Sequence, residues 1–232
     1  MLHQRSYEKE LLDGDNLSFA EIRQNMEELD VINNRLGGHR ITIKGLQAFV
    51  LQMPEDEPLE VVEIGCGGGD NLRVIKQWGA AVKQPVQLTG VDINEDCITY
   101  ACSRSENAGI QFIHSDYRTA VLARKPHIIF SSLFCHHFTN PEIVSMLKWM
   151  HHNAKAGFFI NDLHRHLLPL FSIRILTTLF SKSRLVKHDA PLSVQRGFTR
   201  KELSGLMTEA GLAPYTITWG WAFRWLLIYQ KQ

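Results

Sequence analysis

Short apolar segments alternate with amphipathic segments between residues 59 and 163, and this alternation limits the fold more than any other feature of the sequence. The apolar segments have the length and continuous hydrophobicity of strands buried on both faces: LEVVEIG, VQLTGVDI, IQFIHSD, HIIFSSLF and AGFFINDL. The segments between three of these pairs have helical character: DNLRVIKQW, NEDCITYACSRSE and PEIVSMLKWMHH. Repeated strand–helix–strand units predict an α/β domain with a parallel sheet covered by helices on both faces.

The segment before this alternation is expected to be helical. Ser18 and Glu21 have the spacing of a capping box, which predicts a helix over residues 18–36. A second short helix is expected over residues 42–53. Residues 1–55 therefore form an N-terminal helical extension in this interpretation.

The C-terminal part completes the main domain, which is expected to span residues 56–232. Another helix is predicted over residues 199–211, and residues 216–230 have the pattern of two strands that turn through Gly220. Residues 163–198 form an insertion between the alternating segments and this last helix.

Composition excludes several classes of protein. The 232 residues carry a net charge of +1, which gives no general electrostatic basis for nucleic-acid binding. The four cysteines are scattered without a CxxC pair, so we expect reduced thiols and no metal site. The N-terminus is too polar for a signal peptide, and no apolar stretch approaches the roughly 20 residues needed to span a bilayer. We therefore expect a cytoplasmic protein.

The stretch VVEIGCGGGD, residues 61–70, places four glycines within five positions at the junction of the first strand and the next helix. Glycines at such a junction permit a tight turn and allow a ligand to approach the backbone closely. The N-terminus of the following helix presents free N–H groups at the same place.

Two acids follow the next two predicted strands. Asp92 stands at the end of the second strand, where a carboxylate can accept hydrogen bonds from the two hydroxyls of a ribose. Asp116 follows the third strand, where its carboxylate could accept a hydrogen bond from the amino group of adenine. Ligands of open α/β sheets bind at the carboxyl ends of the strands, so these acids and the glycine loop indicate one nucleoside site.

These segments together resemble the class I methyltransferases that use S-adenosylmethionine, and in particular their small-molecule branch. The loop is similar to the family motif E-x-G-x-G-x-G, which Glu63 opens. The resemblance implies a seven-stranded, mostly parallel sheet whose last strand runs antiparallel between two neighbours. It also implies that S-adenosylmethionine is bound by a set of residues from these motifs: Glu63, Gly65, Cys66, Gly67, Gly69, Asp92, Ile93, Asp116, Tyr117 and Ser131.

A dinucleotide is the alternative ligand. A redox Rossmann domain prefers G-x-G-x-x-G, whereas the glycines here alternate at positions 65, 67 and 69. Asp70 would also lie unfavourably close to two phosphates. We therefore prefer S-adenosylmethionine.

Candidate catalytic residues lie after the fourth and fifth strands. Because imidazole titrates near neutral pH, His136 and His137 are candidates for a base that deprotonates a hydroxyl acceptor, although either could serve only to pack or cap. The NDLHRH segment, residues 161–166, is expected to have a structural or acceptor-orienting role and not to bind a metal. Arg196 could contact an anionic group of the acceptor.

The insertion at residues 163–198 combines apolar residues with basic flanks. In the family that the chain resembles, such insertions and the N-terminal helices form lids over the acceptor. Residues 167–187 could alternatively contact a membrane surface, and an ordinary helix covering the core is the third possibility.

The resulting hypothesis is methyl transfer from S-adenosylmethionine to a small, apolar, quinone- or polyketide-like acceptor. O-methylation is favoured, and C-methylation comes next. The alternatives are a methyltransferase of RNA or protein, a non-catalytic protein that binds the cofactor in a regulatory complex, and, more distantly, an NAD-dependent oxidoreductase. No nucleic-acid partner is expected.

Overall fold

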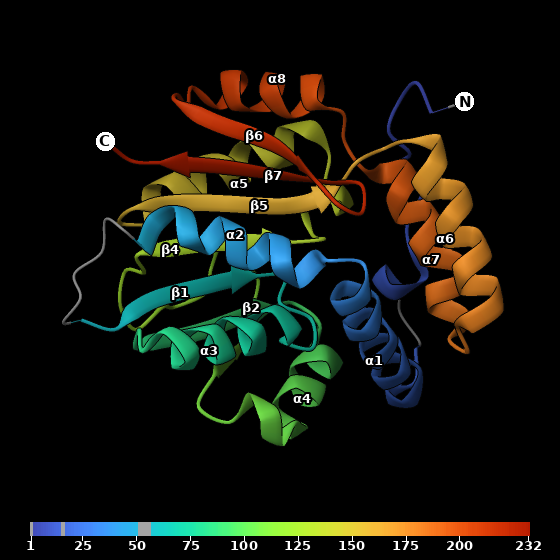
Figure 1. Ribbon diagram of the computed structural model, residues 1–232, viewed down its shortest axis with the longest axis horizontal. Coiled ribbons are helices and arrows are strands. Elements are labelled where there is room, and N and C mark those ends of the chain that lie inside the picture. Colours follow the sequence, from blue (N-terminus) through green and yellow to red (C-terminus); the bar gives the residue numbers. More distant parts are fainter. Residues whose placement is uncertain (1, 15–16, 51–56) are drawn as a thin grey trace.

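The computed structural model describes residues 2–14, 17–50 and 57–232 (Figure 1). Its central sheet has seven strands in the order β3-β2-β1-β4-β5-β7-β6. All neighbouring pairs are parallel except those of β7, which runs antiparallel to both β5 and β6. The strands are β1 Leu59–Ile64, β2 Val86–Asp92, β3 Gln111–His114, β4 Ile128–Ser132, β5 Gly157–Leu163, β6 Tyr215–Gly220 and β7 Arg224–Gln230. The predicted fold class is confirmed, including the antiparallel last strand between two neighbours.

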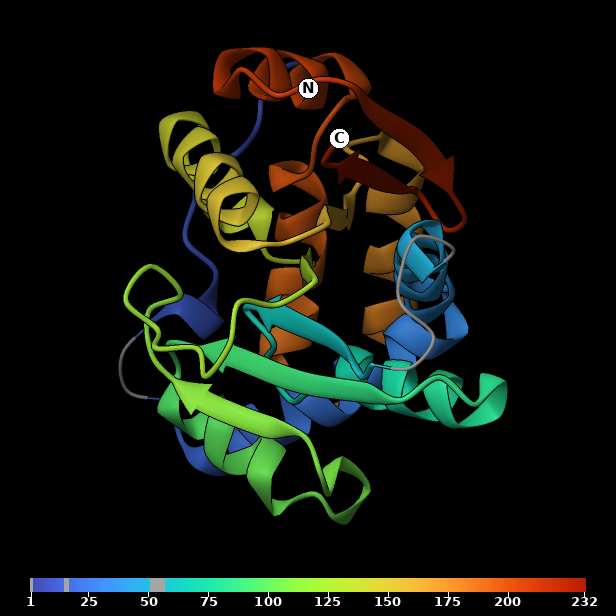
Figure 2. The ribbon, with the colours of Figure 1, turned by 90° about the vertical axis from the view of Figure 1, so that its left-hand side faces the viewer.

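Helices cover both faces of the sheet, as Figure 2 shows. They are α1 Phe19–Arg35, α2 Gly38–Val50, α3 Asp70–Val82, α4 Glu95–Ser103, α5 Asn140–Asn153, α6 Leu167–Phe180, α7 Arg184–Arg196 and α8 Arg200–Ala210. Three short 3₁₀ turns are also present: η1 Leu11–Asp13, η2 Ser105–Asn107 and η3 Cys135–His137.

Successive strand residues enter two different cores because side chains alternate across a sheet. On β5, Phe158 packs in a core with α5 and α8, whereas Phe159 packs in the opposite core with α2, α3 and α4. Phe159 stacks on Phe130 of β4, with ring centroids 4.8 Å apart. The strands are therefore apolar throughout because both of their faces are buried.

Local signals fix several helix ends as expected. The side chain of Ser18 accepts a hydrogen bond from the backbone of Glu21, whose own side chain reaches back to Ser18, so the predicted capping box is present. The helix α2 begins at Gly38, four residues before the predicted start, and its Phe49 packs against the sheet. The predicted end of α2 and the proposed division at residue 55 fall outside the described residues.

The helices α1, α6 and α7 stand beyond the carboxyl ends of the parallel strands, at the right of Figure 1. The insertion predicted at residues 163–198 thus consists of the antiparallel pair α6 and α7 together with short connections. No helix in the described part of the chain is long and apolar enough to cross a membrane.

Candidate active site

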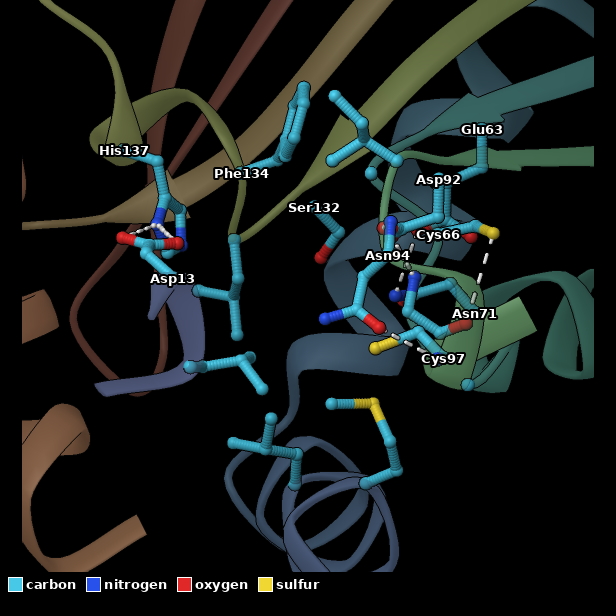
Figure 3. Close-up of a pocket in the computed structure, with 18 of the residues that line it drawn as sticks. Asp13, Glu63, Cys66, Asn71, Asp92, Asn94, Cys97, Ser132, Phe134 and His137 are labelled. Carbon is cyan, nitrogen blue, oxygen red and sulfur yellow. Dashed lines mark hydrogen bonds and ion pairs between the residues drawn. The ribbon is translucent and has the colours of Figure 1, made fainter. Parts of the chain in front are cut away.

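A cavity of about 670 Å³ opens at the carboxyl ends of β1, β2 and β4. The glycine loop, α1 and the N-terminal segment, residues 2–14, complete its walls. Figure 3 shows Glu63, Asp92 and Asn94 at one end of the cavity and His137 with Asp13 at the other. Apolar side chains line the space between these ends: Leu12, Met26, Leu29, Leu133, Phe134 and Phe138.

Two glycines of the loop, Gly65 and Gly67, have left-handed backbone conformations but different surroundings. Gly65 has a φ of +67°, and a Cβ placed there would come within 2.1 Å of the Phe134 ring. Gly67 has a φ of +49° and lies at the cavity wall, where the nearest side-chain atom to such a Cβ would be the sulfur of Met26, at 3.3 Å. Tight packing therefore explains Gly65, whereas Gly67 leaves the backbone open toward the cavity.

Asp92 is held at the tip of β2 by two backbone groups. Its carboxylate accepts hydrogen bonds from the N–H of Gly67 at 2.8 Å and from the N–H of Asn94 at 2.9 Å. Burial raises the pKa of Asp92, while these hydrogen bonds act in the opposite direction. The carboxylate lines the cavity in a fixed orientation and keeps lone pairs for a ligand.

Glu63 lies at the floor of the same end and is 1% exposed. One carboxylate oxygen accepts a hydrogen bond from the Asn71 amide at 3.2 Å, and Oε2 has no partner within the described part of the chain. Burial, with additional repulsion from Asp70 and Asp92, raises the pKa of Glu63 well above its usual range. An orphaned buried carboxylate oxygen beside a cavity is suited to a cationic hydrogen-bond donor, such as an ammonium group.

Three other predicted cofactor residues also belong to the glycine-loop region. Cys66 and Ile93 line the cavity, and burial raises the pKa of the Cys66 thiol well above its usual value. Gly69 does not reach the cavity, because it packs against Phe112.

The structure does not bring the remaining three to the cavity. Asp116 is paired with Arg118 at the surface, and Tyr117 packs edge-on against Trp149 in the core. Ser131 is fully buried beside Cys135, whereas the next residue, Ser132, lines the cavity. Ser131 and Ser132 differ because consecutive strand residues face opposite sides. The role of Asp116 toward adenine stays a prediction.

His137 is the histidine that faces the cavity, and its side chain is 19% exposed. Its Nδ1 lies 3.1 Å from the Asp13 carboxylate, and its Nε2 lies 3.7 Å from Glu10. If Asp13 accepts the Nδ1 proton, the lone pair of a neutral ring is on Nε2. Asp13 thereby orients His137 as an acid or base at this end of the cavity.

His136 faces away from the cavity, and the structure contradicts its prediction as a base. It is 2% exposed, its Nδ1 lies 2.8 Å from Asp162, and its Nε2 lies 3.5 Å from Glu10. Burial alone would lower its pKa, but the charges and hydrogen bonds of Asp162 and Glu10 prevail and raise the pKa of His136 to about 9. A protonated imidazole has no lone pair with which to act as a base.

Two buried arginines extend this network. Arg5 donates to the carbonyls of His136 and Phe138, and Arg196 donates to the carbonyls of Glu8, His136 and His137. Arg196 lines the cavity, but its guanidinium N–H groups are used on the backbone. The structure therefore gives Arg196 a positioning role toward η3, and contact with an anionic acceptor stays a prediction.

Possible metal ligands also meet here. The ligand atoms of Glu10, His136 and His137 lie within 4.8 Å of one another. Within the part of the chain that is described, the protonated His136 and the nearby Arg196 already balance the carboxylates. We therefore describe the cluster as an ion-pair network.

The NDLHRH segment has mainly structural contacts. Asp162 pairs with His136, Arg165 binds Glu202 at the start of α8 with N–O distances of 2.7 and 2.9 Å, and His166 caps α6. These contacts agree with the structural role expected for the segment.

Sequence reasoning missed the N-terminal segment as part of the site. Asp13 and Leu12 line the cavity, and Arg5 and Glu10 hold η3 from below. The spacing of these residues has no local signature, because their partners lie more than 120 positions away. Asn94 was missed as well, although its position after GVDI could have indicated a helix cap next to the nucleoside site.

Comparison with known proteins gives a consistent result. Residues 61–157 match a family model described as a methyltransferase domain. A search of curated proteins found no match.

Solved structures share the fold at low sequence identity. The chain is similar to the plantazolicin methyltransferase BpumL in complex with SAH, with 18% identity, a TM-score of 0.64, and coverage of 90% of this chain and 99% of that one. Human N-acetylserotonin methyltransferase in complex with SAM has 19% identity and a TM-score of 0.63. The match covers 93% of this chain and 57% of that one. Magnesium protoporphyrin IX methyltransferase from Synechocystis, with bound SAH, has 14% identity and a TM-score of 0.52. The match covers 94% of this chain and 90% of that one.

The match over residues 61–157 identifies a methyltransferase domain in this chain, and the sheet order gives the chain the fold of the class I methyltransferases.

Proposed function

We propose that the protein methylates a hydroxyl group of a small, apolar acceptor, with His137 as the general base. The observation that carries this proposal is the two-ended cavity, with carboxylates at one end, a histidine–carboxylate pair at the other and apolar walls between them (Figure 3).

The residues at the glycine-loop end fit the cofactor. Asp92 offers a fixed carboxylate for ribose hydroxyls, and the unpaired oxygen of Glu63 suits the ammonium of the methionine part. When bound, S-adenosylmethionine supplies a methyl group on a positively charged sulfur. The backbone at Gly67 allows close approach because no side chain projects there.

The opposite end fits an acceptor hydroxyl. His137 can take the hydroxyl proton on Nε2, and Asp13 stabilises the imidazolium that results. Glu10 lies 3.7 Å from the same Nε2. The apolar walls favour a phenol- or hydroquinone-like acceptor of the quinone or polyketide type.

Methyl incorporation from labelled S-adenosylmethionine into a panel of alkyl-substituted phenols and hydroquinones tests the proposal. On an accepted phenol, His137→Gln is expected to lower kcat about 10²- to 10⁴-fold, because it removes the general base. Asp13→Asn should lower kcat less and shift its pH profile, because Asp13 acts through His137. Both variants should bind S-adenosylhomocysteine like the wild type.

His152→Gln, at an exposed position on α5, is the matched control and should keep full activity. If His137→Gln also keeps full activity, His137 is not the base. If the protein binds the cofactor but methylates no acceptor in the panel or in a cell extract, the non-catalytic alternative is favoured.

A further inference from the structure

The outer face of α6 exposes an apolar surface to solvent. Its large side chains recur at helical spacing along one side of the helix: Leu167, Leu168, Phe171, Ile175, Leu176, Leu179 and Phe180. Leu179 is 67% exposed and Phe180 77% exposed. The inner side of α6 is separately buried, through Leu170 and Ile173, against Val194 of α7. The exposed face is therefore not needed to attach α6 to the protein.

The apolar surface continues onto neighbouring elements. A groove of about 460 Å³ lies between α1 and α6 and is lined by Val31, Leu176 and Phe180, among others. At the other end of α6, His166 stacks on Phe223 of the β6–β7 turn, which carries the exposed side chain of Trp221. In Figure 1 this turn lies beside the α6–α7 pair.

The charged side chains of α6 and of the residues that follow it, up to position 188, are basic. Residues 163–188 contain no aspartate or glutamate, although the whole chain has nearly equal numbers of acids and bases. Arg174, Lys182 and Lys187 are exposed along or just after α6. On the α1 side of the groove, Glu27 pairs with Arg23. Glu28 accepts hydrogen bonds from the backbone N–H groups of Lys182 and Ser183. An apolar helix face flanked by unpaired basic side chains is typical of helices that lie in the interface of an anionic membrane.

We propose that the outer face of α6, together with the groove beside α1 and the Trp221 turn, docks on an anionic lipid bilayer. The 14-residue helix is about 21 Å long, so it lies in the plane of the interface and does not span the bilayer. Tryptophan is favoured at the headgroup level, which suits the position of Trp221. Docking is independent of the proposed methyl transfer.

A lipid surface explains the face better than a second copy of the chain. A two-fold dimer places the same patch of both copies in one interface. The basic residues Arg174, Lys182 and Lys187 would then be gathered at one interface, while the acids of the groove, Glu27 and Glu28, already have partners in the same chain. Anionic headgroups supply the missing negative charge.

Docking also has a consequence for the cavity. The helix α1 lines the cavity with Met26 and Leu29 and lines the groove with Val31 and Ile32. A single helix thus separates the lipid-facing groove from the proposed acceptor site. An apolar acceptor dissolved in the bilayer would be presented next to that site.

Vesicle flotation tests the proposal with the full-length protein. Vesicles of phosphatidylcholine with phosphatidylglycerol should carry the protein upward, and vesicles of phosphatidylcholine alone should carry it much less. Phe171→Ser with Leu179→Ser should lower the partition coefficient at least tenfold, because both exposed side chains lose their burial in the lipid. Lys182→Gln with Lys187→Gln should lower the partition coefficient about fivefold for each charge removed. High salt should also lower the partition coefficient of the wild type, because it screens the attraction to anionic headgroups.

Val82→Ser, which removes an exposed apolar side chain at the end of α3, is the matched control and should bind like the wild type. The proposal is overturned if the wild type stays unbound with anionic vesicles, or if both double variants bind as well as the control. It is also overturned if light scattering shows a wild-type dimer that the Phe171 and Leu179 changes dissociate while flotation is absent. Circular dichroism of each variant verifies the fold, and the lysine variant leaves the packing of α6 intact.

Discussion

Glu63 and Asp92, two carboxylates at the glycine-loop end of the cavity, have different surroundings. Asp92 accepts two backbone hydrogen bonds, whereas Glu63 has a single amide partner and a free oxygen. Burial raises the pKa of both, and that of Glu63 much more strongly. Glu63 is therefore the group whose protonation should respond to a cation in the cavity.

We predict that cofactor binding releases a proton from Glu63. Without ligand, burial raises the pKa of Glu63 and so favours its protonated form, whereas an ammonium group next to it favours the carboxylate. Titration calorimetry with S-adenosylhomocysteine in buffers of different ionisation heat should show this release for the wild type. The affinity should also rise with pH.

Glu63→Gln is the matched variant, because it keeps the shape and an oxygen for Asn71. It should bind at least about tenfold more weakly. Its thermal stability should not fall, because it removes a buried acid. Equal proton release by the wild type and the variant would contradict this role for Glu63.

Buried charges join the N-terminal segment to η3 and β5 at the proposed acceptor end of the cavity. The N-terminal segment supplies Arg5 and Glu10, η3 supplies His136, and β5 supplies Asp162. Because His136 is protonated, it links two carboxylates, Glu10 and Asp162, that lie 152 positions apart in the sequence. This attachment should depend on pH.

We predict that the network loses stability in alkali. The pKa of His136 rises from 6.5 to about 9 on folding, so its contribution is complete below about pH 6.5 and disappears as the pH rises through 9. The loss should amount to about 3 kcal/mol of unfolding free energy. Urea unfolding of the wild type and of His136→Asn across this range measures it.

The difference in stability between these two proteins should shrink as the pH rises, and His152→Asn, on the surface of α5, should show no such change. A difference that stays constant across the range would show that His136 is not charged in the folded protein.

At the scale of the whole molecule, the parallel strands and α1, which stands beyond their carboxyl ends in Figure 1, meet at one cavity. The cavity walls come from β1, β2, β4, α1 and the N-terminal segment, which are spread over the first 142 residues, together with Arg196. A ligand that contacts all of these elements should stabilise the complete fold.

We predict that S-adenosylhomocysteine raises the midpoint of thermal unfolding. At about 100 times its dissociation constant, the ligand should add about 2.7 kcal/mol, or a shift of roughly 5–10 °C for a chain of this size. NADH at the same concentration should give no shift. Asp92→Ala should remove about half of the shift, because it weakens binding about tenfold or more.

A shift with NADH alone would favour the dinucleotide alternative instead. Asp116→Ala serves as the comparison for Asp92→Ala, because Asp116 is paired with Arg118 outside the cavity lining. If Asp116→Ala loses the shift in unfolding midpoint, the predicted contact between Asp116 and adenine is supported.

The amino-acid sequence alone determined the order of strands and helices along the chain, the capping box at Ser18, and the position of Asp92 at a strand end. These features depend on neighbours within a few residues, such as side-chain alternation and helix capping, so a linear pattern contains them. The fold class and the position of the glycine loop and Asp92 beside one cavity could be predicted for that reason.

Only the tertiary structure decided which of two adjacent histidines faces the cavity. His137 is oriented by Asp13, 124 positions away, and His136 is buried by Asp162 and Glu10. The tertiary structure likewise decided that the N-terminal segment closes the site and that α6 leaves an apolar face exposed. Contacts between distant parts of the chain set burial and charge, and burial and charge determine whether a histidine is a base or one member of a buried ion pair.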